Sequence, residues 1–197
     1  MEGAIYPGTC RNRCAVEGNT EFAWRWRFEP GRVAWIDEVL GQQVADPARQ
    51  LGDFVIGKSD GTPAYQLAVV VDDHDMGVTE IVRGSDLVPS TYRQLAILRQ
   101  LEWQAPKYCH VPLIVGPDGR RLAKRHGDTR LSYFRERGVK SQVLVGYLAW
   151  TLGLLATLEE IEPQELVELD KKLDWRQISA EPTVFNLDDF LRRYASL

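Results

Sequence analysis

Apolar residues occur in short runs separated by charged or glycine-containing turns, a pattern that predicts an α/β fold. The most continuous run, residues 62–71, predicts a strand buried on both faces, as in a parallel sheet. Four charged or titratable residues follow directly at 72–75, and a second strand is expected at 78–82. Because ligands of open α/β sheets bind where strands end, these positions indicate a site at that edge.

The segments on either side of these strands have different patterns. Residues 22–28, Phe-Ala-Trp-Arg-Trp-Arg-Phe, alternate with period two, which predicts a half-buried strand; arginines among aromatic rings also suit phosphates and stacked bases. A strand is expected at 111–115, with a tight turn at 116–119. Helices are expected at residues 90–101, 129–137 and 141–155, with further helix starts at Pro163 and Asn186.

Composition limits the class of protein. The 197 residues with 44% hydrophobic content suffice for a buried core, and a formal net charge of −4 excludes a broadly basic coat for nucleic acid, so any RNA contact must be local. Three cysteines without the paired spacing of a secreted scaffold, and no long apolar run or signal peptide, favour a reducing cytoplasm and no membrane.

The most informative segment is Leu-Ala-Lys-Arg-His-Gly at residues 122–127, which places basic side chains in a glycine-flanked loop after a short strand. Four of the six residues from Arg120 to Arg125 are basic, which suggests an anion such as phosphate. Taken alone, the segment also fits a solvated loop that happens to be basic.

Several motifs resemble the catalytic domain of glutamyl-tRNA synthetases, which are class I aminoacyl-tRNA synthetases. They are Asp60-Gly61, Tyr65-Gln-Leu-Ala68, Val71-Asp72-Asp73, Met76-Gly77-Val78-Thr79, Val82-Arg83-Gly84-Ser85-Asp86 and Gln94. The loop at 122–127 is similar to the KMSKS loop of that family, although Ala123 stands where the family usually has serine. The resemblance implies the second half of a Rossmann-like nucleotide-binding domain, followed by a helical region that contacts tRNA.

The resemblance also implies roles for individual residues. Tyr65 and Arg83 match the positions that hold glutamate, and a guanidinium fork can grip a carboxylate through two parallel hydrogen bonds. Lys124 matches the lysine that holds ATP phosphates, within a KMSKS-like loop of Arg121, Leu122, Ala123, Lys124 and Arg125. Without the resemblance, Tyr65 could equally be a core aromatic and Arg83 a partner in a strand-end ion pair.

A second resemblance, to glutamyl-queuosine tRNA(Asp) synthetases, involves the N-terminal segment Ile5-Tyr-Pro-Gly-Thr-Cys-Arg11. It implies that Tyr6 and Cys10 are half of a tetrahedral zinc site. Cys14, at Cys-x-x-x-Cys spacing from Cys10, is a candidate third ligand. A HIGH-type motif would precede this segment in the family, so we expect the resemblance to begin in mid-domain and an N-terminal half to be missing.

These resemblances divide the chain into a zinc-module remnant at 1–20, a catalytic part at 21–127 and a helical region at 128–197. They imply an ATP-dependent ligase that activates glutamate, with Mg²⁺, and transfers it to queuosine in the anticodon of tRNA(Asp). A non-catalytic remnant that binds tRNA is the alternative, and a synthetase that charges the acceptor end of tRNA is a third.

Overall fold

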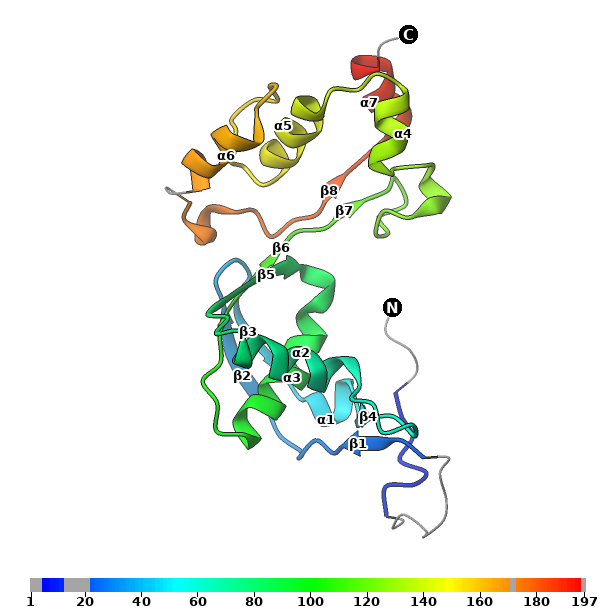
Figure 1. The fold of residues 1–197 in the computed structure, drawn as a ribbon, viewed down its shortest axis with the longest axis vertical. Helices are drawn as coiled ribbons and strands as arrows, with labels where there is room; N and C mark the ends of the chain where they lie inside the picture. The colour runs from blue at the N-terminus through cyan, green and yellow to red at the C-terminus, as the bar shows by residue number, and fades with distance from the viewer. Residues whose placement is uncertain (1–4, 13–21, 171–172, 196–197) are drawn as a thin grey trace. The chain divides into compact units, whose positions relative to one another are not determined.

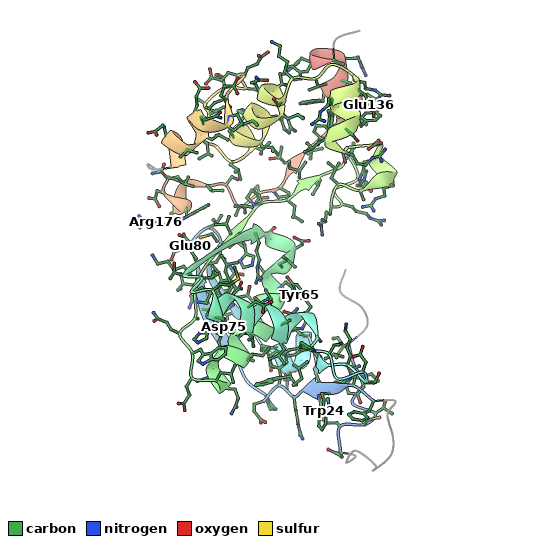
Figure 2. The ribbon with its side chains drawn as sticks, viewed as in Figure 1. Trp24, Tyr65, Asp75, Glu80, Glu136 and Arg176 are labelled. Atoms are coloured by element: carbon green, nitrogen blue, oxygen red, sulfur yellow. The ribbon has the colours of Figure 1, made fainter. Side chains whose placement is uncertain are left out.

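The computed structural model describes residues 5–12, 22–170 and 173–195, which form two compact units. The first unit contains Met1–Asp37, Gly41–Val82 and Asp86–Tyr108, and the second contains Glu38–Leu40, Arg83–Ser85 and Cys109–Leu197. Figure 1 shows the elements of both units, and Figure 2 adds the side chains. Within the described ranges, no helix has the length and apolar character needed to cross a membrane.

A four-stranded sheet in the order β3-β2-β6-β5 is the largest sheet among the described residues. Its strands are β2 (Val33–Asp37), β3 (Gly41–Ala45), β5 (Glu80–Gly84) and β6 (Lys107–Val111). The β2–β3 pair is an antiparallel hairpin, whereas β2 and β6 run parallel. A separate antiparallel pair joins β1 (Trp24–Trp26) to β4 (Phe54–Gly57), and the short helix α1 (Pro47–Gln50) precedes β4. The strand predicted within residues 22–28 is thereby confirmed as β1.

The run at residues 62–71 is not a strand, which corrects the sequence prediction. It belongs to the helix α2 (Tyr65–Asp75), preceded by a turn in which Asp60 Oδ1 accepts hydrogen bonds from the Thr62 N–H and hydroxyl. A continuous apolar run carries no periodicity, so it fits a buried strand and a buried helix equally well. Pro63 favours the helix, because proline cannot donate a hydrogen bond within a central strand.

The core of the first unit lies where α2 and α3 (Val88–Gln100) pack on the strands. α3 confirms the helix expected at 90–101 and begins earlier because Pro89 suits the first turn. Trp35 of β2 makes edge contacts with Tyr92 of α3 and Tyr108 of β6, with ring centroids 5.8 and 5.7 Å apart. The buried side chains of this core are Phe28, Phe54, Val70, Ile97 and Leu98.

The second unit is mainly helical. Its elements are β7 (Ile114–Val115), α4 (Leu131–Glu136), α5 (Ser141–Thr151), α6 (Pro163–Asp170), β8 (Thr183–Val184) and α7 (Leu187–Tyr194), with the short 3-10 helices η2 (Lys124–His126) and η3 (Trp175–Gln177). A further 3-10 helix, η1 (Ser85–Leu87), directly precedes α3. The strands β7 and β8 pair in parallel. Its aromatic core contains Phe134, Val139, Val143, Phe185 and Phe190. The predicted helix starts at Pro163 and Asn186 are confirmed, and Asn186 Oδ1 caps α7 by accepting from the Asp189 N–H.

The strand expected at residues 111–115 is split, which is a second correction. β6 ends at Val111 and β7 begins at Ile114, with Pro112 between them. Proline has no N–H to donate, so it interrupts a strand at this point. The consequence is that β7 can leave the larger sheet and pair with β8 instead.

Candidate functional site

The basic loop is the continuation of a small hairpin in the second unit. The Gly116 N–H donates to Arg120 O at 2.8 Å and the Leu122 N–H to Ile114 O at 3.1 Å, so the chain turns back on β7. The Gly119 N–H closes the tight turn by donating to Gly116 O at 2.9 Å, as the glycines at 116 and 119 predicted. Lys124 therefore follows a hydrogen-bonded hairpin rather than an unstructured segment.

The hairpin is joined to the η2 turn by the imidazole of His126. The Ala123 N–H donates to His126 Nδ1 at 3.1 Å, and His126 Nε2 lies 2.8 Å from Asp118 Oδ1. A backbone N–H can only donate, so Nδ1 is the acceptor and the neutral ring carries its proton on Nε2. Nε2 then donates to the Asp118 carboxylate, and the ring links two points of the loop.

The Asp118 carboxylate accepts hydrogen bonds from several donors in the turn. The Arg120 N–H donates to Oδ1 at 3.0 Å, and Arg125 Nε donates to Oδ2 at 3.4 Å in addition to the His126 bond. The Arg120 N–H is the main cause that lowers the pKa of Asp118, with His126 and Arg125 acting in the same direction. The carboxylate is therefore charged at neutral pH and holds its donors together.

Apolar contacts attach the same loop to the core of the second unit. Leu122 packs against the Phe134 and Phe185 cluster, so the loop's first residue is an anchor. Gly127 has φ of 97°, and a Cβ there would lie 2.5 Å from Leu187 Cδ2, which only glycine avoids without displacement. Arg120, Arg121 and Arg125 are exposed, so the loop presents cationic side chains to solvent while its backbone is fixed.

Arg83 lies on β5 and is partly buried. Its Nε donates to Nε2 of His110 at 3.0 Å, and His110 on β6 is fully buried. Because Nε2 is an acceptor in this bond, the neutral His110 ring carries its proton on Nδ1. The bond holds the guanidinium in one plane, and because it uses Nε, two parallel hydrogen bonds to a carboxylate would come from the two Nη groups.

Tyr65 is the first residue of α2 and belongs to the first unit, whereas Arg83 and Lys124 belong to the second. Its side chain is 60% exposed, so it is not the core aromatic that the sequence also allowed (Figure 2). Its neighbour Gln66 donates to Ser90 Oγ at 3.0 Å and accepts from Gln94 Nε2 at 3.2 Å. These bonds tie the start of α2 to α3 and so position Tyr65.

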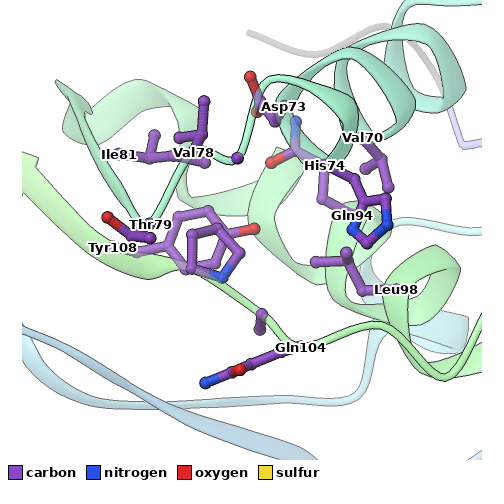
Figure 3. A pocket seen from close by; sticks show the side chains of 13 residues that line it. Val70, Asp73, His74, Val78, Thr79, Ile81, Gln94, Leu98, Gln104 and Tyr108 are labelled. Carbon is purple, nitrogen blue, oxygen red and sulfur yellow. The ribbon is translucent and has the colours of Figure 1, made fainter.

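A pocket of about 310 Å³ lies within the first unit and does not include Tyr65. Figure 3 shows Asp73 of α2 with Gln94 and Tyr108 among its lining side chains. His74 also lines it and stacks on Trp103, with ring centroids 3.7 Å apart. Asp73 and His74, which the sequence placed just after a strand, thus line this pocket from the helix α2.

Tyr6 and Cys10, the two predicted zinc ligands, lie next to each other. The Cys10 N–H donates to the Tyr6 hydroxyl at 2.7 Å, and the Arg25 guanidinium lies 4.1 Å from the centre of the Tyr6 ring. Cys14 lies outside the described residues. Zinc needs four ligands, and nowhere among the described residues do three His, Cys, Asp or Glu side chains gather for a metal. The described residues therefore do not fit a complete zinc site.

Three residues of these sites were not identified from the sequence: His110 beside Arg83, and Asp118 with His126 in the loop. Arg83 and His110 are 27 residues apart, and only the pairing of neighbouring strands reveals their contact. Asp118 and His126 are eight residues apart, and the Asp in a Gly-Pro-Asp-Gly turn followed by a histidine was the available signal.

Directly after the loop, Arg130 and Asp128 form an ion pair, which predicts a lowered pKa for the Asp128 carboxyl group. Arg130 Nε donates to both carboxylate oxygens of Asp128, at 2.9 and 3.0 Å, and the resulting stabilisation of the anion lowers the pKa of Asp128 to about 2. An NMR titration of this carboxyl group should therefore have its midpoint near 2, and Arg130→Gln should raise it towards the ordinary 3.8.

The sign of the linked stability follows from the lowered pKa. The folded-state pKa of Asp128 lies below its ordinary value, so the ion pair with Arg130 stabilises the folded state fully above about pH 4. This contribution to the stability of the fold is lost as the pH falls towards 2. A wild-type midpoint equal to that of the Arg130→Gln variant would contradict the pairing.

Comparison with known proteins places this chain in a family. The family model of class I tRNA synthetases (E and Q), catalytic domain, matches residues 17–191. A glutamyl-Q tRNA(Asp) synthetase of Rhodopirellula baltica is 42% identical over 96% of this chain and 61% of its own length. That of Symbiobacterium thermophilum is 41% identical over 92% and 57%, and a glutamate–tRNA ligase of Coxiella burnetii is 36% identical over 94% and 39%.

Solved structures agree with these relatives. The crystal structure of a glutamate-tRNA synthetase from Elizabethkingia anophelis superposes with a TM-score of 0.68 at 25% identity, covering 81% of this chain and 35% of that one. The chain thus spans about three fifths of the length of its glutamyl-Q relatives. It belongs to the class I tRNA synthetases of the glutamate and glutamine type, and its mixed α/β fold is that of their catalytic domain.

Proposed function

We propose that this chain serves the ATP-dependent activation of glutamate and its transfer to queuosine in the anticodon of tRNA(Asp). The observation that carries the proposal is the hydrogen-bonded loop at residues 122–127, with the exposed Arg121 and Arg125, in a chain whose residues 17–191 match the catalytic domain of the class I tRNA synthetases. The resemblance of this loop to the KMSKS loop supports a role in holding ATP. The names of the glutamyl-Q relatives at 41–42% identity support queuosine as the acceptor.

The proposed chemistry uses the residues in separate roles. Arg83, held by His110, pairs with a carboxylate of glutamate, and Tyr65 contributes its exposed hydroxyl. The free carboxylate of glutamate attacks the α-phosphorus of ATP, and pyrophosphate leaves. Lys124 stabilises the charge that grows on the phosphates in this step, and Mg²⁺ accompanies the nucleotide. The glutamyl group then passes from the adenylate to tRNA, and AMP leaves.

A second candidate function is charging of the acceptor end of tRNA, which the 36% identity to the Coxiella burnetii glutamate–tRNA ligase favours. Both candidates share the adenylation step and differ in the nucleotide that accepts glutamate. The difference between them is therefore in the tRNA substrate.

The test, made with the full-length protein, is glutamate-dependent exchange of pyrophosphate into ATP, followed by labelling of tRNA(Asp) with radioactive glutamate. We expect exchange, and labelling only of tRNA that contains queuosine. Equal labelling of queuosine-containing and queuosine-lacking tRNA would contradict the queuosine assignment and favour the acceptor end. Absence of exchange, with tRNA present, would contradict an enzymatic role and favour a tRNA-binding chain.

A further inference from the structure

The backbone around Lys124 is held by one side chain that the proposed chemistry does not use. His126 accepts from the Ala123 N–H and approaches Asp118 Oδ1, so its ring connects the residue before Lys124 to the turn of the hairpin. The His126 side chain is only 8% exposed, although Asp118 is 43% exposed. The ring of His126 is therefore part of the internal structure of the loop and not one of its exposed basic side chains.

The hairpin has space for this ring because of Gly116. A Cβ at Gly116 would lie 2.4 Å from His126 Cδ2 and 2.5 Å from Nε2, closer than any side chain can approach. The backbone of Gly116 does not have a positive φ, so the glycine is needed for the ring rather than for the turn. Glycine and histidine thus form one fitted contact across the loop.

The two bonds of the ring act on different parts of the loop. The bond to Nδ1 orients the Ala123 peptide, and the His126 N–H donates back to Ala123 O at 2.8 Å, which closes the η2 turn around Lys124. The bond from Nε2 attaches this turn to Asp118, which the Arg120 N–H and Arg125 also hold. The position of the Lys124 backbone is therefore set by the ring and not only by the hairpin.

From these contacts we propose that His126 is a positioning residue for the adenylation step. The proposal rests on the proposed function: the His126 latch, made of the His126 ring, the Ala123 N–H and the Asp118 carboxylate, holds the loop in the conformation from which Lys124 meets the ATP phosphates. A preformed loop spares the enzyme the reorganisation of this charge during the reaction. Displacement of the loop should therefore lower kcat more than it raises the KM for ATP.

The first test detects the hydrogen bonds of the His126 latch directly and does not depend on a measurement of enzymatic activity. A ¹⁵N NMR spectrum of the ring nitrogens at neutral pH should show a protonated Nε2 and an unprotonated Nδ1 for His126. Hydrogen exchange at the Ala123 amide should accelerate in His126→Ala and remain slow in Glu136→Gln, an exposed change on α4. A proton on Nδ1, or an unchanged exchange rate in His126→Ala, would overturn the latch.

The second test measures the role in catalysis. His126→Ala should lower kcat for glutamate-dependent pyrophosphate exchange by roughly tenfold to a hundredfold, the scale of a small misplacement of a catalytic group. Gly116→Ala, which displaces the ring without removing it, should have the same effect, and Glu136→Gln should have none. His126→Asn retains an acceptor near Nδ1 and His126→Gln a donor near Nε2, so each should recover part of the lost kcat.

The outcomes separate this proposal from the proposed function. An unchanged kcat in His126→Ala would overturn the positioning role. The role would also be overturned if His126→Ala, Gly116→Ala, His126→Asn and His126→Gln all lost kcat equally and only in proportion to their loss of folded protein. A wild-type chain that shows the predicted ring protonation but no exchange of pyrophosphate would overturn the proposed function, and the positioning role with it, while the latch would stand as a structural feature.

Discussion

Replacing Lys124 with alanine in the intact enzyme is expected to lower the rate of glutamate adenylation by on the order of a hundredfold or more. The charge on the phosphates grows as the carboxylate attacks the α-phosphorus, so an ammonium group beside them stabilises the transition state more than it stabilises bound ATP. The loss should therefore appear in kcat and in kcat/KM, with a smaller change in the KM for ATP.

Single-turnover formation of the glutamyl adenylate is the measurement that isolates this step. Lys124→Arg keeps a charge at the same position and should lose less than Lys124→Ala, although a planar guanidinium does not replace an ammonium point charge. Glu136→Gln on α4 serves as the control for an exposed change in the same unit. A single-turnover rate that is unchanged in Lys124→Ala would exclude the role, whatever the effect on ATP affinity.

The sequence identified the loop and its turn because their signals are local. Gly116, Gly119 and Gly127 mark the positions where the chain must turn or approach another segment closely, and the structure has the turn at 116–119. The helix α7 was equally readable, because Asn186 followed by acidic residues is a capping pattern that needs no tertiary contact.

The split of the strand at Pro112 had a local signal, whereas two other misses, α2 and the partner of Arg83, depend on contacts that are distant in sequence. The run that forms α2 has apolar residues without a clear period, and its packing of Val70 against α3 decides for a helix. The contact of His110 with Arg83 depends on how β5 and β6 are paired in the sheet, which no spacing of residues announces. Residue types therefore indicated which side chains could bind a ligand, but the partners that hold those side chains, such as His110, could be identified only from the fold.

Arg83→Lys is expected to lower kcat/KM for glutamate by roughly 30-fold or more, which corresponds to about 2 kcal/mol. Lysine retains the charge but cannot make two parallel hydrogen bonds to a carboxylate. It also removes the Nε donor and leaves Nε2 of the fully buried His110 without this bond. The effect should appear in the KM for glutamate, and discrimination against glutamine should fall with it.

A double-mutant cycle with His110 distinguishes positioning of Arg83 from a general loss of stability. His110→Gln keeps an acceptor for Arg83 Nε and should cost little, whereas His110→Leu removes the acceptor and should raise the KM for glutamate. Because the two residues contact each other, His110→Leu should cost much less in the Arg83→Lys background than in the wild type. Additive effects on kcat/KM would show that the bond does not orient the guanidinium, and an unchanged KM in Arg83→Lys would exclude Arg83 from the glutamate site.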